Sequence, residues 1–329
     1  MQDHKRFARA VVPASTANLG PGFDSLGMAL PLFYGVGLRK SERTCIYLHG
    51  EHVAGIPQDK SNLVYAAAQS VFARAGVDLP ELEIALESDF PMTRGLGSSA
   101  AAIVGALAAA NGLIGFPLST DELFQIAASM ERHPDNVGAA LFGGFVAAAW
   151  DGQRAEAVKL APPTDLEVLV AIPAFELATQ KARSVLPQQV PLADAVFNVS
   201  HSSLLTAALA SGELAVLRHA LRDRLHQPYR AGMIPGMADI LRGAPEQGAL
   251  GAVLSGAGPT LLMLADRREA QRERLEMFVK DTMNAAGVEV SMQWMKPCGQ
   301  GARVAVGESD GELGAPLAAL LGECSEVGV

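Results

Sequence analysis

The segment that decides the fold is Pro91-Met-Thr-Arg-Gly-Leu-Gly-Ser-Ser-Ala-Ala101, a glycine-serine stretch that opens a long, alanine-rich apolar run. Its glycines let the backbone come close to a ligand, and Ser98 and Ser99 begin a helix that we expect to reach about Leu113. The amide groups and the dipole at the start of such a helix suit a phosphate group. Taken alone, the segment fits a serine-capped linker equally well, so other segments must decide between the two interpretations.

Several known nucleotide-binding and catalytic motifs are absent from the chain. Gly95, Gly97 and Ala100 could be read as GxGxxA, but residues 88–94 separate these glycines from the preceding strand pattern, and the dinucleotide fingerprint needs a tight turn there. No lysine follows a glycine, so the phosphate loop of Walker A type is missing. The HRD and DFG motifs of protein kinases, GxSxG and HExxH are missing as well.

Expected strands and expected helices lie on both sides of this segment in the sequence. Residues 7–14 resemble a strand that leads into the loop Asn18-Leu-Gly-Pro-Gly-Phe-Asp24. Residues 61–75 have the apolar spacing of a helix, with Ser61 as its cap, and Ser119 with Glu122 forms a capping box before the next helix. Further strands are expected at 82–86, 145–150, 166–172 and near 288, and further helices at 196–210, 213–222 and from 266.

Length and composition indicate a two-lobed α+β protein. The chain has 329 residues, of which 49% are hydrophobic, 19% charged and 5% aromatic, so aliphatic side chains must build the core. The pair Pro162-Pro163 is the best candidate for a boundary. We therefore expect an N-terminal domain at 1–161, a C-terminal domain at 162–306 and a peripheral acidic tail at 307–329.

Charge and cysteine content narrow the class of protein. A net charge of −9 argues against nucleic acid as a partner. The uncharged run 95–120 contains polar residues, proline and glycines, which favours a buried helix over a membrane span. Residues 1–10 are charged where a signal peptide would have its apolar run, and Cys45, Cys298 and Cys324 form neither a metal spacing nor a disulfide framework, so we expect a cytoplasmic protein.

Two further clusters stand out. In Glu131-Arg-His-Pro-Asp-Asn-Val137, a carboxylate, an imidazole and an amide come together around a proline. His133 fits a structural histidine and Asp135 fits a turn residue about as well as either fits a site. The third cluster, Leu254-Ser-Gly-Ala-Gly-Pro-Thr260, lies between two apolar runs, where a hairpin turn is compatible with a site role.

In their order and spacing, these three clusters resemble the three motifs of the GHMP kinases, over about residues 7–305. The segments 13–27, 133–137 and 226–230 look like those of the homoserine kinases within that superfamily. The resemblance implies an N-terminal domain with a left-handed βαβ unit similar to ribosomal protein S5. It also implies a ferredoxin-like C-terminal domain, with ATP and substrate bound in the cleft between the two.

The resemblance also implies roles for particular residues. The ATP phosphates would be wrapped by Pro91, Met92, Thr93, Arg94, Gly95, Leu96, Gly97, Ser98, Ser99, Ala100 and Ala101. Ser98 or Ser99 would reach Mg²⁺ or phosphate, and Ser99 with Glu131 is the expected magnesium pair. The amino-acid substrate would contact Asn18, Asp24, His133, Asn136, Arg183 and Arg230, and the catalytic residues would be Ser99, Glu131 and Asn136.

The function that the resemblance implies is ATP-dependent phosphorylation of the L-homoserine hydroxyl to O-phospho-L-homoserine, in threonine biosynthesis. Homoserine carries an ammonium, a carboxylate and a hydroxyl group, for which Asp24, the two arginines and Asn136 offer matching partners. Two alternatives stay open: a kinase of the same superfamily for a mevalonate-like or sugar alcohol, and a non-catalytic metabolite-binding protein of the same fold. The resemblance also leaves a homodimer open.

Overall fold

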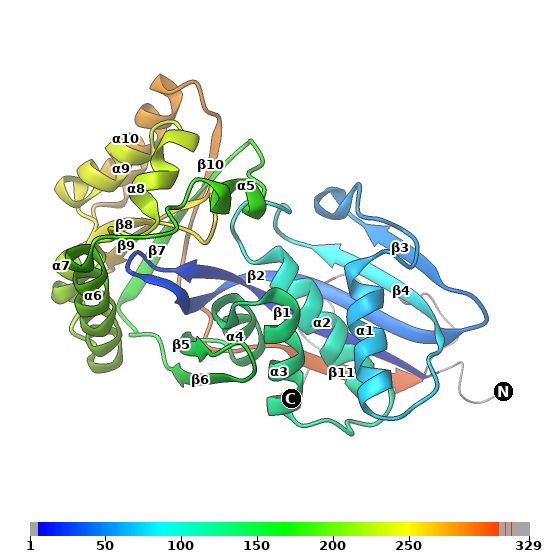
Figure 1. Ribbon diagram of the computed structural model, residues 1–329. Coiled ribbons are helices and arrows are strands. Elements are labelled where there is room, and N and C mark those ends of the chain that lie inside the picture. The colour runs from blue at the N-terminus through cyan, green and yellow to red at the C-terminus, as the bar shows by residue number, and fades with distance from the viewer. Residues whose placement is uncertain (1–5, 309–312, 314–316, 318–329) are drawn as a thin grey trace.

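The computed structural model describes residues 6–308, Leu313 and Leu317, and shows two lobes, each built on its own sheet (Figure 1). The first lobe has a seven-stranded sheet, made of β1 (Arg6–Asn18), β2 (Gly22–Ser41), β3 (Cys45–His49), β4 (Glu81–Ser88), β5 (Phe145–Trp150), β6 (Ala155–Leu160) and β11 (Arg303–Glu308). Its strand order is β11-β1-β2-β4-β3, and β5 pairs with both β2 and β6. β3 and β4 run parallel on either side of α1 (Leu63–Arg74) in the sequence, which makes a βαβ unit.

The helices of the first lobe gather on one face of this sheet (Figure 1). They are α1, α2 (Ser98–Leu113), α3 (Thr120–Glu131) and α4 (Pro134–Phe142), with a short 3₁₀ turn at Glu51–Val53. From Ala100 to Leu113 every residue of α2 is buried. A helix that is apolar on all sides must be buried on all sides, and α2 packs between β1, β2 and the other three helices. The uncharged run is therefore a central core helix.

The helix starts follow local hydrogen bonding. The capping box of Ser119 and Glu122 at the start of α3 is confirmed. The expected cap at Ser61 is wrong, because the Ser61 hydroxyl donates to Asp59 at 2.5 Å. Asn62 caps α1 instead, and its side chain accepts from the amide of Val64 at 2.8 Å.

The second lobe has a four-stranded antiparallel sheet in the order β10-β7-β9-β8. Its strands are β7 (Leu166–Pro173), β8 (Gly251–Leu254), β9 (Leu261–Asp266) and β10 (Val290–Met295). Its α-helices are α5 (Thr179–Ser184), α6 (Leu192–Ser211), α7 (Leu217–Ala220), α8 (Gln227–Arg230), α9 (Met237–Gly243) and α10 (Arg272–Ala285), and its 3₁₀ turns are Leu214–Val216, Ala231–Met233 and Ala244–Gln247. With helices between β7 and β8 and between β9 and β10, this confirms the ferredoxin-like arrangement.

Both faces of the second sheet are buried, which explains why β7 is a continuous apolar run. Val168 and Val170 belong to the core shared with the first lobe. Leu169 and Ala171 point the other way, into a second core with α9 and α10. This alternation is the two-residue period of a strand that has packed layers on both sides.

Two expected helices of this lobe have different bounds. The helix expected over 213–222 is a 3₁₀ turn at Leu214–Val216 followed by α7. The helix expected from Asp266 begins at Arg272 instead. Asp266 ends β9, and its side chain accepts from the amide of Arg268 at 3.0 Å, so it acts as a turn residue.

The chain passes from the first sheet to the second between Leu160 and Leu166, but it later returns. β11 pairs with β1, so residues 303–306 of the expected C-terminal domain belong to the first sheet. In the expected peripheral tail, Leu313 and Leu317 are buried against Gly37 and Gly35 of β2. The rest of the segment 309–329, Cys324 included, lies outside the described residues.

None of the helices in the described part of the chain is long and apolar enough to cross a membrane.

Candidate active site

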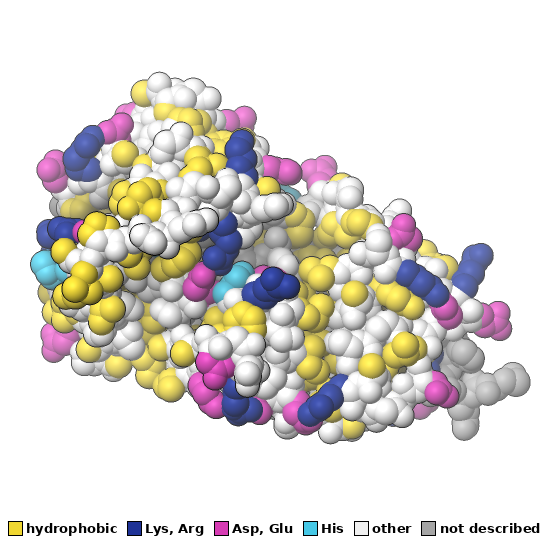
Figure 2. All heavy atoms as spheres, in the orientation of Figure 1, with side chains coloured by type: hydrophobic (Ala, Val, Ile, Leu, Met, Phe, Trp, Pro, Cys, Tyr) yellow, Lys and Arg dark blue, Asp and Glu magenta, His cyan; other side chains and the backbone are white. Residues whose placement is uncertain are grey.

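A cavity of about 570 Å³ opens where the two lobes meet. Figure 2 shows this hollow, with basic, acidic and histidine side chains gathered at its edge. It is formed by the β1–β2 turn, the loop before α2, the α3–α4 turn, α5, α8 and the β8–β9 turn. The predicted site residues that line it are Asn18, Asp24, Thr93, Gly95, Gly97, Ser98, Ser99, Ala100, Glu131, His133, Asn136, Arg183 and Arg230.

The glycines of the loop before α2 pack against the protein's own chain. Gly97 has φ +68°, and an added Cβ would lie 2.0 Å from Ser15 Oγ. Gly95 has φ +81°, and an added Cβ would lie 2.4 Å from the carbonyl oxygen of Ser255. These contacts add a structural reason to the expected one, which is that the glycines let the backbone come close to a ligand. Glycine is needed here for the left-handed backbone and for close packing on β1 and on the β8–β9 turn.

The third sequence cluster holds this loop in place. The Ser255 hydroxyl donates to the carbonyl of Gly95 at 2.5 Å, and the amide of Thr260 donates to the carbonyl of Arg94 at 3.2 Å. The amide of Gly256 donates to the carbonyl of Ala17 at 3.1 Å. The cluster is thus both the hairpin turn between β8 and β9 and a wall of the site.

The start of α2 faces the cavity. Gly97 occupies the cap position and offers no side-chain hydrogen bond to the first turn. The first amides of any α-helix lack partners within the helix, so those of α2 are available to an anion. Ser98 and Ser99 line the cavity here, and the Ser99 hydroxyl donates to the Glu131 carboxylate.

Five residues of the predicted phosphate segment do not line the cavity: Pro91, Met92, Arg94, Leu96 and Ala101. Leu96 and Ala101 point into the hydrophobic core. The largely buried Arg94 side chain points away from the cavity, donates to the carbonyl of Ala174 at 3.2 Å and lies 3.4 Å from the Glu176 carboxylate. The prediction treated the segment as one continuous wall, whereas its side chains point in different directions.

Asn18 supports the turn between β1 and β2. Its Nδ2 donates to the carbonyl of Gly256 at 2.9 Å, and its Oδ1 accepts from the amide of Asp24 at 3.0 Å. Asn18 and Asp24 both have positive φ angles, 71° and 55°, so the turn is strained and needs such a support. Both polar atoms of the Asn18 side chain are therefore engaged in supporting this turn, and a contact of Asn18 with the substrate stays a prediction.

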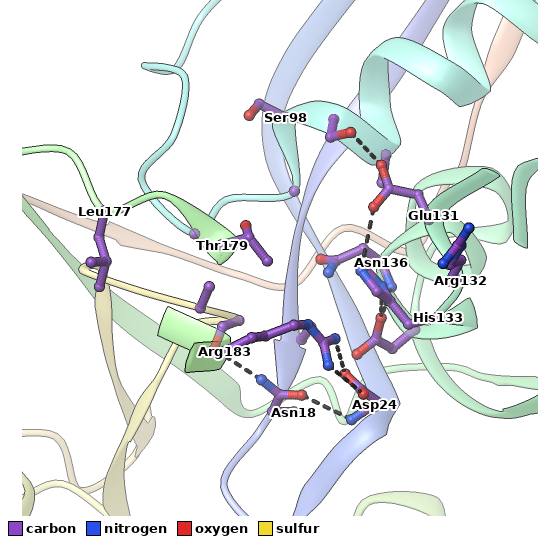
Figure 3. A pocket seen from close by; sticks show the side chains of 18 of the residues that line it. Asn18, Asp24, Ser98, Glu131, Arg132, His133, Asn136, Leu177, Thr179 and Arg183 are labelled. Atoms are coloured by element: carbon purple, nitrogen blue, oxygen red, sulfur yellow. Dashed lines mark hydrogen bonds and ion pairs between the residues drawn. The ribbon is translucent and has the colours of Figure 1, made fainter. Parts of the chain in front are cut away.

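Asp24 and Arg183 form a two-point ion pair, with Nη1 to Oδ2 at 3.0 Å and Nη2 to Oδ1 at 2.6 Å (Figure 3). About a third of each side chain is exposed to the cavity. The resemblance had placed them on opposite charges of the substrate, and the structure pairs them with each other. A zwitterionic substrate offers Asp24 a positive partner and Arg183 a negative one. Its binding can therefore replace the ion pair without leaving either side chain unpaired.

Arg230 is 1% exposed and is held by the second lobe. Its Nε donates to the carbonyl of Ala182 at 3.1 Å, and its Nη1 donates to the carbonyl of Gly256 at 3.0 Å. Burial, together with the nearby charge of Arg183, lowers the pKa of Arg230 to about 10. This pKa still lies far above neutrality, so Arg230 brings a fixed positive charge to the cavity wall.

A buried polar network orients Arg230. His226 Nδ1 accepts from Arg230 Nη1 at 3.3 Å, and His226 Nε2 donates to the carbonyl of Gly20 at 2.7 Å. Burial lowers the pKa of His226, which favours this neutral form. The Asp223 carboxylate accepts from the amides of His226 and Gln227 at 3.1 and 2.7 Å. Residues 226–230 stood out in the sequence only because they resemble those of homoserine kinases. The structure gives them a physical role, since this network orients Arg230.

The second cluster forms a chain of polar side chains across the cavity. His133 Nδ1 lies 3.0 Å from Asp135, and His133 Nε2 lies 3.4 Å from Glu131. Burial opposes the charged imidazole, but the hydrogen bond to Asp135 and the charges of Asp135, Glu131 and Asp24 together raise the pKa of His133. Asn136 Oδ1 accepts from Ser15 Oγ at 2.9 Å, which leaves its Nδ2 group to face the cavity.

The donors near the start of α2 fit Mg²⁺. Ser99 and Glu131 offer a hydroxyl and a carboxylate oxygen side by side, which are ligands that a hard cation prefers. Within the described part of the chain, no group of three or more His, Cys, Asp or Glu side chains could hold a metal. A site with few protein ligands suits Mg²⁺, which in kinases is bound largely through phosphates and water.

The cavity is also lined by residues that were not among the predicted site residues, namely Ala17, Phe23, Arg132, Asp135, Leu177, Thr179, Gln180 and, from the third cluster, Gly256 and Ala257. Phe23 stacks on His226 at 5.2 Å between ring centroids, and the guanidinium groups of Arg183 and Arg230 lie 5.5 and 5.4 Å from its ring. An aromatic ring can hold two like charges side by side. The signal was present, because Phe23 directly precedes Asp24 in a glycine-rich turn.

Comparison with known proteins agrees with this geometry. The GHMP kinases N terminal domain family matches residues 62–144, and the GHMP kinases C terminal family matches residues 205–282. The homoserine kinase of Moorella thermoacetica is 44% identical over 297 residues, 89% of this chain and 98% of that protein. That of Deinococcus radiodurans is 47% identical over 276 residues, 84% of this chain and 90% of that protein.

Solved structures show the same fold. The crystal structure of homoserine kinase from Cytophaga hutchinsonii superposes with a TM-score of 0.82 and 29% identity, over 93% of this chain and 98% of that one. A mevalonate kinase structure superposes with a TM-score of 0.63 at 14% identity, a likeness of fold alone. By sequence and by fold, the chain belongs to the homoserine kinase family of the GHMP kinase superfamily.

Proposed function

We propose that this protein transfers the γ-phosphoryl group of ATP to the hydroxyl of L-homoserine, giving ADP and O-phospho-L-homoserine. The observation that carries the proposal is the pairing of Asp24 with Arg183 in the cavity, beside the buried Arg230. One anion and two cations match the ammonium and carboxylate of an amino acid. The relatives named above support the same substrate.

On the nucleotide side, the fixed backbone before α2 and the first amides of that helix would hold the phosphates of ATP. Ser99 and Glu131 would hold Mg²⁺, which when bound neutralises charge on the phosphates. The loop is hydrogen-bonded to β1, where the amide of Ser15 donates to the carbonyl of Leu96 at 3.1 Å, and to the second lobe through Ser255. This anchoring serves phosphoryl transfer, which depends mostly on positioning.

On the acceptor side, Asp24 would bind the ammonium group of homoserine, and Arg183 and Arg230 its carboxylate. Asn136, fixed by Ser15, would orient the hydroxyl through Nδ2. The hydroxyl oxygen then bonds to the γ-phosphorus, the bond from phosphorus to the ADP oxygen breaks, and the hydroxyl proton is released. His133 lies near enough to Asp24 and Glu131 to influence the charge of both sites.

The alternatives are less well supported. A mevalonate or sugar substrate has no ammonium group to replace Arg183 as the partner of Asp24, so binding would leave a charge unpaired. A non-catalytic protein would not need the aligned Ser99 and Glu131 at the start of α2. The threonine pathway and a cytoplasmic location remain predictions that accompany the proposed activity.

The test is ADP release with L-homoserine, mevalonate, galactose and shikimate as acceptors, together with phosphorus NMR of the product. We expect homoserine to be preferred by a kcat/KM ratio on the order of 10³ or more, because other alcohols leave buried charges unpaired. The product signal should be that of a phosphate monoester on homoserine. Equal or faster turnover of mevalonate or a sugar would refute the proposal.

A further inference from the structure

Arg132 occupies a backbone position that favours glycine. It ends α3 in the left-handed conformation, with φ 63° and ψ 16°. Glycine is the usual residue there, because a Cβ atom is strained in this region. The protein itself uses Gly212, with φ 77°, at the corresponding end of α6. Arg132 is therefore retained at a cost in stability, which suggests that its side chain has a task.

The side chain of Arg132 is exposed at the edge of the cavity and is not engaged by the protein. Within residues 6–308 and at Leu313 and Leu317, no hydrogen bond or ion pair involves it. The other two arginines of the cavity wall do have partners, since Arg183 is paired with Asp24 and Arg230 is bound to backbone carbonyls. Arg132 is thus the guanidinium of this wall that is available to a ligand.

In the sequence, Arg132 stands between two residues that reach different parts of the cavity wall. Its neighbour Glu131 reaches Ser99 at the start of α2, and its neighbour His133 contacts Asp135 within the acceptor half (Figure 3). The group that must pass between these two parts is the transferred phosphoryl group. The developing charge on that group is what a guanidinium stabilises in phosphoryl transfer.

We infer that Arg132 contacts the γ-phosphoryl group of the nucleotide and stabilises it during transfer, as a further catalytic residue. The inference rests on the proposed kinase function. The charge of the wall agrees with it: its three carboxylates, of Asp24, Glu131 and Asp135, are matched in number by its three arginines, with His133 beside them. Without Arg132, a polyphosphate would enter a wall whose acidic side chains outnumber its arginines.

The decisive variant is Arg132→Gly, because it removes the guanidinium and relieves the strained backbone together. We expect kcat with homoserine to fall about 10- to 100-fold, the effect of losing one charged hydrogen bond in the transition state. The KM for homoserine should change less than about 3-fold, and Arg132→Lys should restore part of kcat. The Tm of Arg132→Gly should rise. The control Arg242→Met removes an exposed arginine of α9 and should leave kcat unchanged.

A binding measurement gives a readout that does not depend on turnover. By calorimetry with Mg²⁺, Arg132→Gly should bind the non-hydrolysable analogue AMP-PNP about 10-fold more weakly than wild type, and ADP equally well. Equal losses for both nucleotides, or no loss for either, would overturn the contact with the γ-phosphoryl group.

Measurements of kcat and Tm also distinguish a failure of this inference from a failure of the proposed function. Wild-type kcat in Arg132→Gly would overturn the inference and leave the proposed function intact. A fall in kcat that comes with a fall in Tm would assign Arg132 to folding, which overturns it too. If the wild-type protein does not phosphorylate homoserine, the proposed function fails, and the two nucleotide affinities still decide whether Arg132 meets the γ-phosphoryl group.

Discussion

The two halves of the cavity are formed by different parts of the chain, one by backbone and the other by side chains. The phosphate half, formed by the loop before α2 and the start of that helix, is made of backbone held in place by Ser15 and Ser255. The proposed acceptor half, formed by Asp24, His133, Asn136, Arg183 and Arg230, is made of charged and polar side chains. The loop of the phosphate half therefore depends on the absence of side chains at Gly95 and Gly97, and the acceptor half depends on the charge of its side chains. Substitutions should separate the two halves cleanly.

The largest effect is expected in the phosphate half, from Gly97→Val. Any Cβ there would meet Ser15 Oγ at 2.0 Å, so the loop must move away from β1. We expect the KM for ATP to rise on the order of 100-fold, the usual cost of displacing binding groups by about 1 Å, with little change in homoserine binding.

The matched control is Gly152→Val, since Gly152 also has a positive φ angle, 93°, but no atom lies within 4 Å of an added Cβ. It should leave the KM for ATP unchanged. A folded Gly97→Val protein with wild-type ATP affinity would contradict the role of backbone packing.

In the acceptor half, Arg230→Met and Arg183→Met should lower kcat/KM for homoserine about 10- to 150-fold, because each removes a charged hydrogen bond to the substrate carboxylate. Their effects on folding should differ. Arg230→Met leaves the buried carbonyls of Ala182 and Gly256 without a donor and should cost about 1–3 kcal/mol or more of unfolding free energy. Arg183 is partly exposed, so its loss should cost about 1 kcal/mol at most. Urea titration measures both, and an unchanged KM for ATP is the check on specificity.

Glu131→Gln should act on the phosphate half without changing the acceptor half. A neutral amide is a weaker ligand for Mg²⁺, so we expect kcat to fall about tenfold or more and the required magnesium concentration to rise. Glu176→Gln, at an exposed carboxylate beside Arg94, is the matched control and should behave as wild type. If Glu131→Gln keeps the wild-type magnesium dependence, another carboxylate holds the ion.

The smallest effect concerns pH. Because the pKa of His133 is raised above its ordinary 6.5 in the folded protein, its contribution to stability is complete below about pH 6.5. The contribution is lost as the pH rises through the folded-state pKa. His133→Gln should remove this part of the pH dependence, measured as the free energy of unfolding between pH 6 and 9. An identical slope in both proteins would show that the Asp135 contact does not stabilise the charged imidazole.

Much of the site could be predicted from the sequence, because its motifs are short and local. The loop around Gly97, the turn around His133 and the turn around Ser255 each appear as unusual runs of glycine, proline and polar residues. The alternatives raised for His133 and Asp135 were partly right, since the two side chains bond to each other as well as lining the cavity. The packing of Gly97 against Ser15 could not be predicted, because Ser15 lies on β1, far from Gly97 in the sequence.

The features that the sequence did not predict depend on contacts between distant residues. β11 pairs with β1 across almost the whole chain, and no local pattern shows this pairing. The pairing of Asp24 with Arg183 and the hydrogen bond of Arg94 to the carbonyl of Ala174 likewise depend on how the lobes meet. Arg132 was quoted in the sequence but not singled out, since only the structure shows that its backbone is left-handed.

The most direct test of the acceptor half compares kcat/KM for L-homoserine with that for 3-aminopropan-1-ol, which lacks the carboxylate. Wild type should prefer homoserine strongly, and Arg183→Met and Arg230→Met should lose most of that preference while keeping wild-type KM for ATP. The ratio isolates the carboxylate, because the amine and hydroxyl are the same in both alcohols. If both variants keep the wild-type ratio, the carboxylate is bound elsewhere and the account of this cavity is wrong.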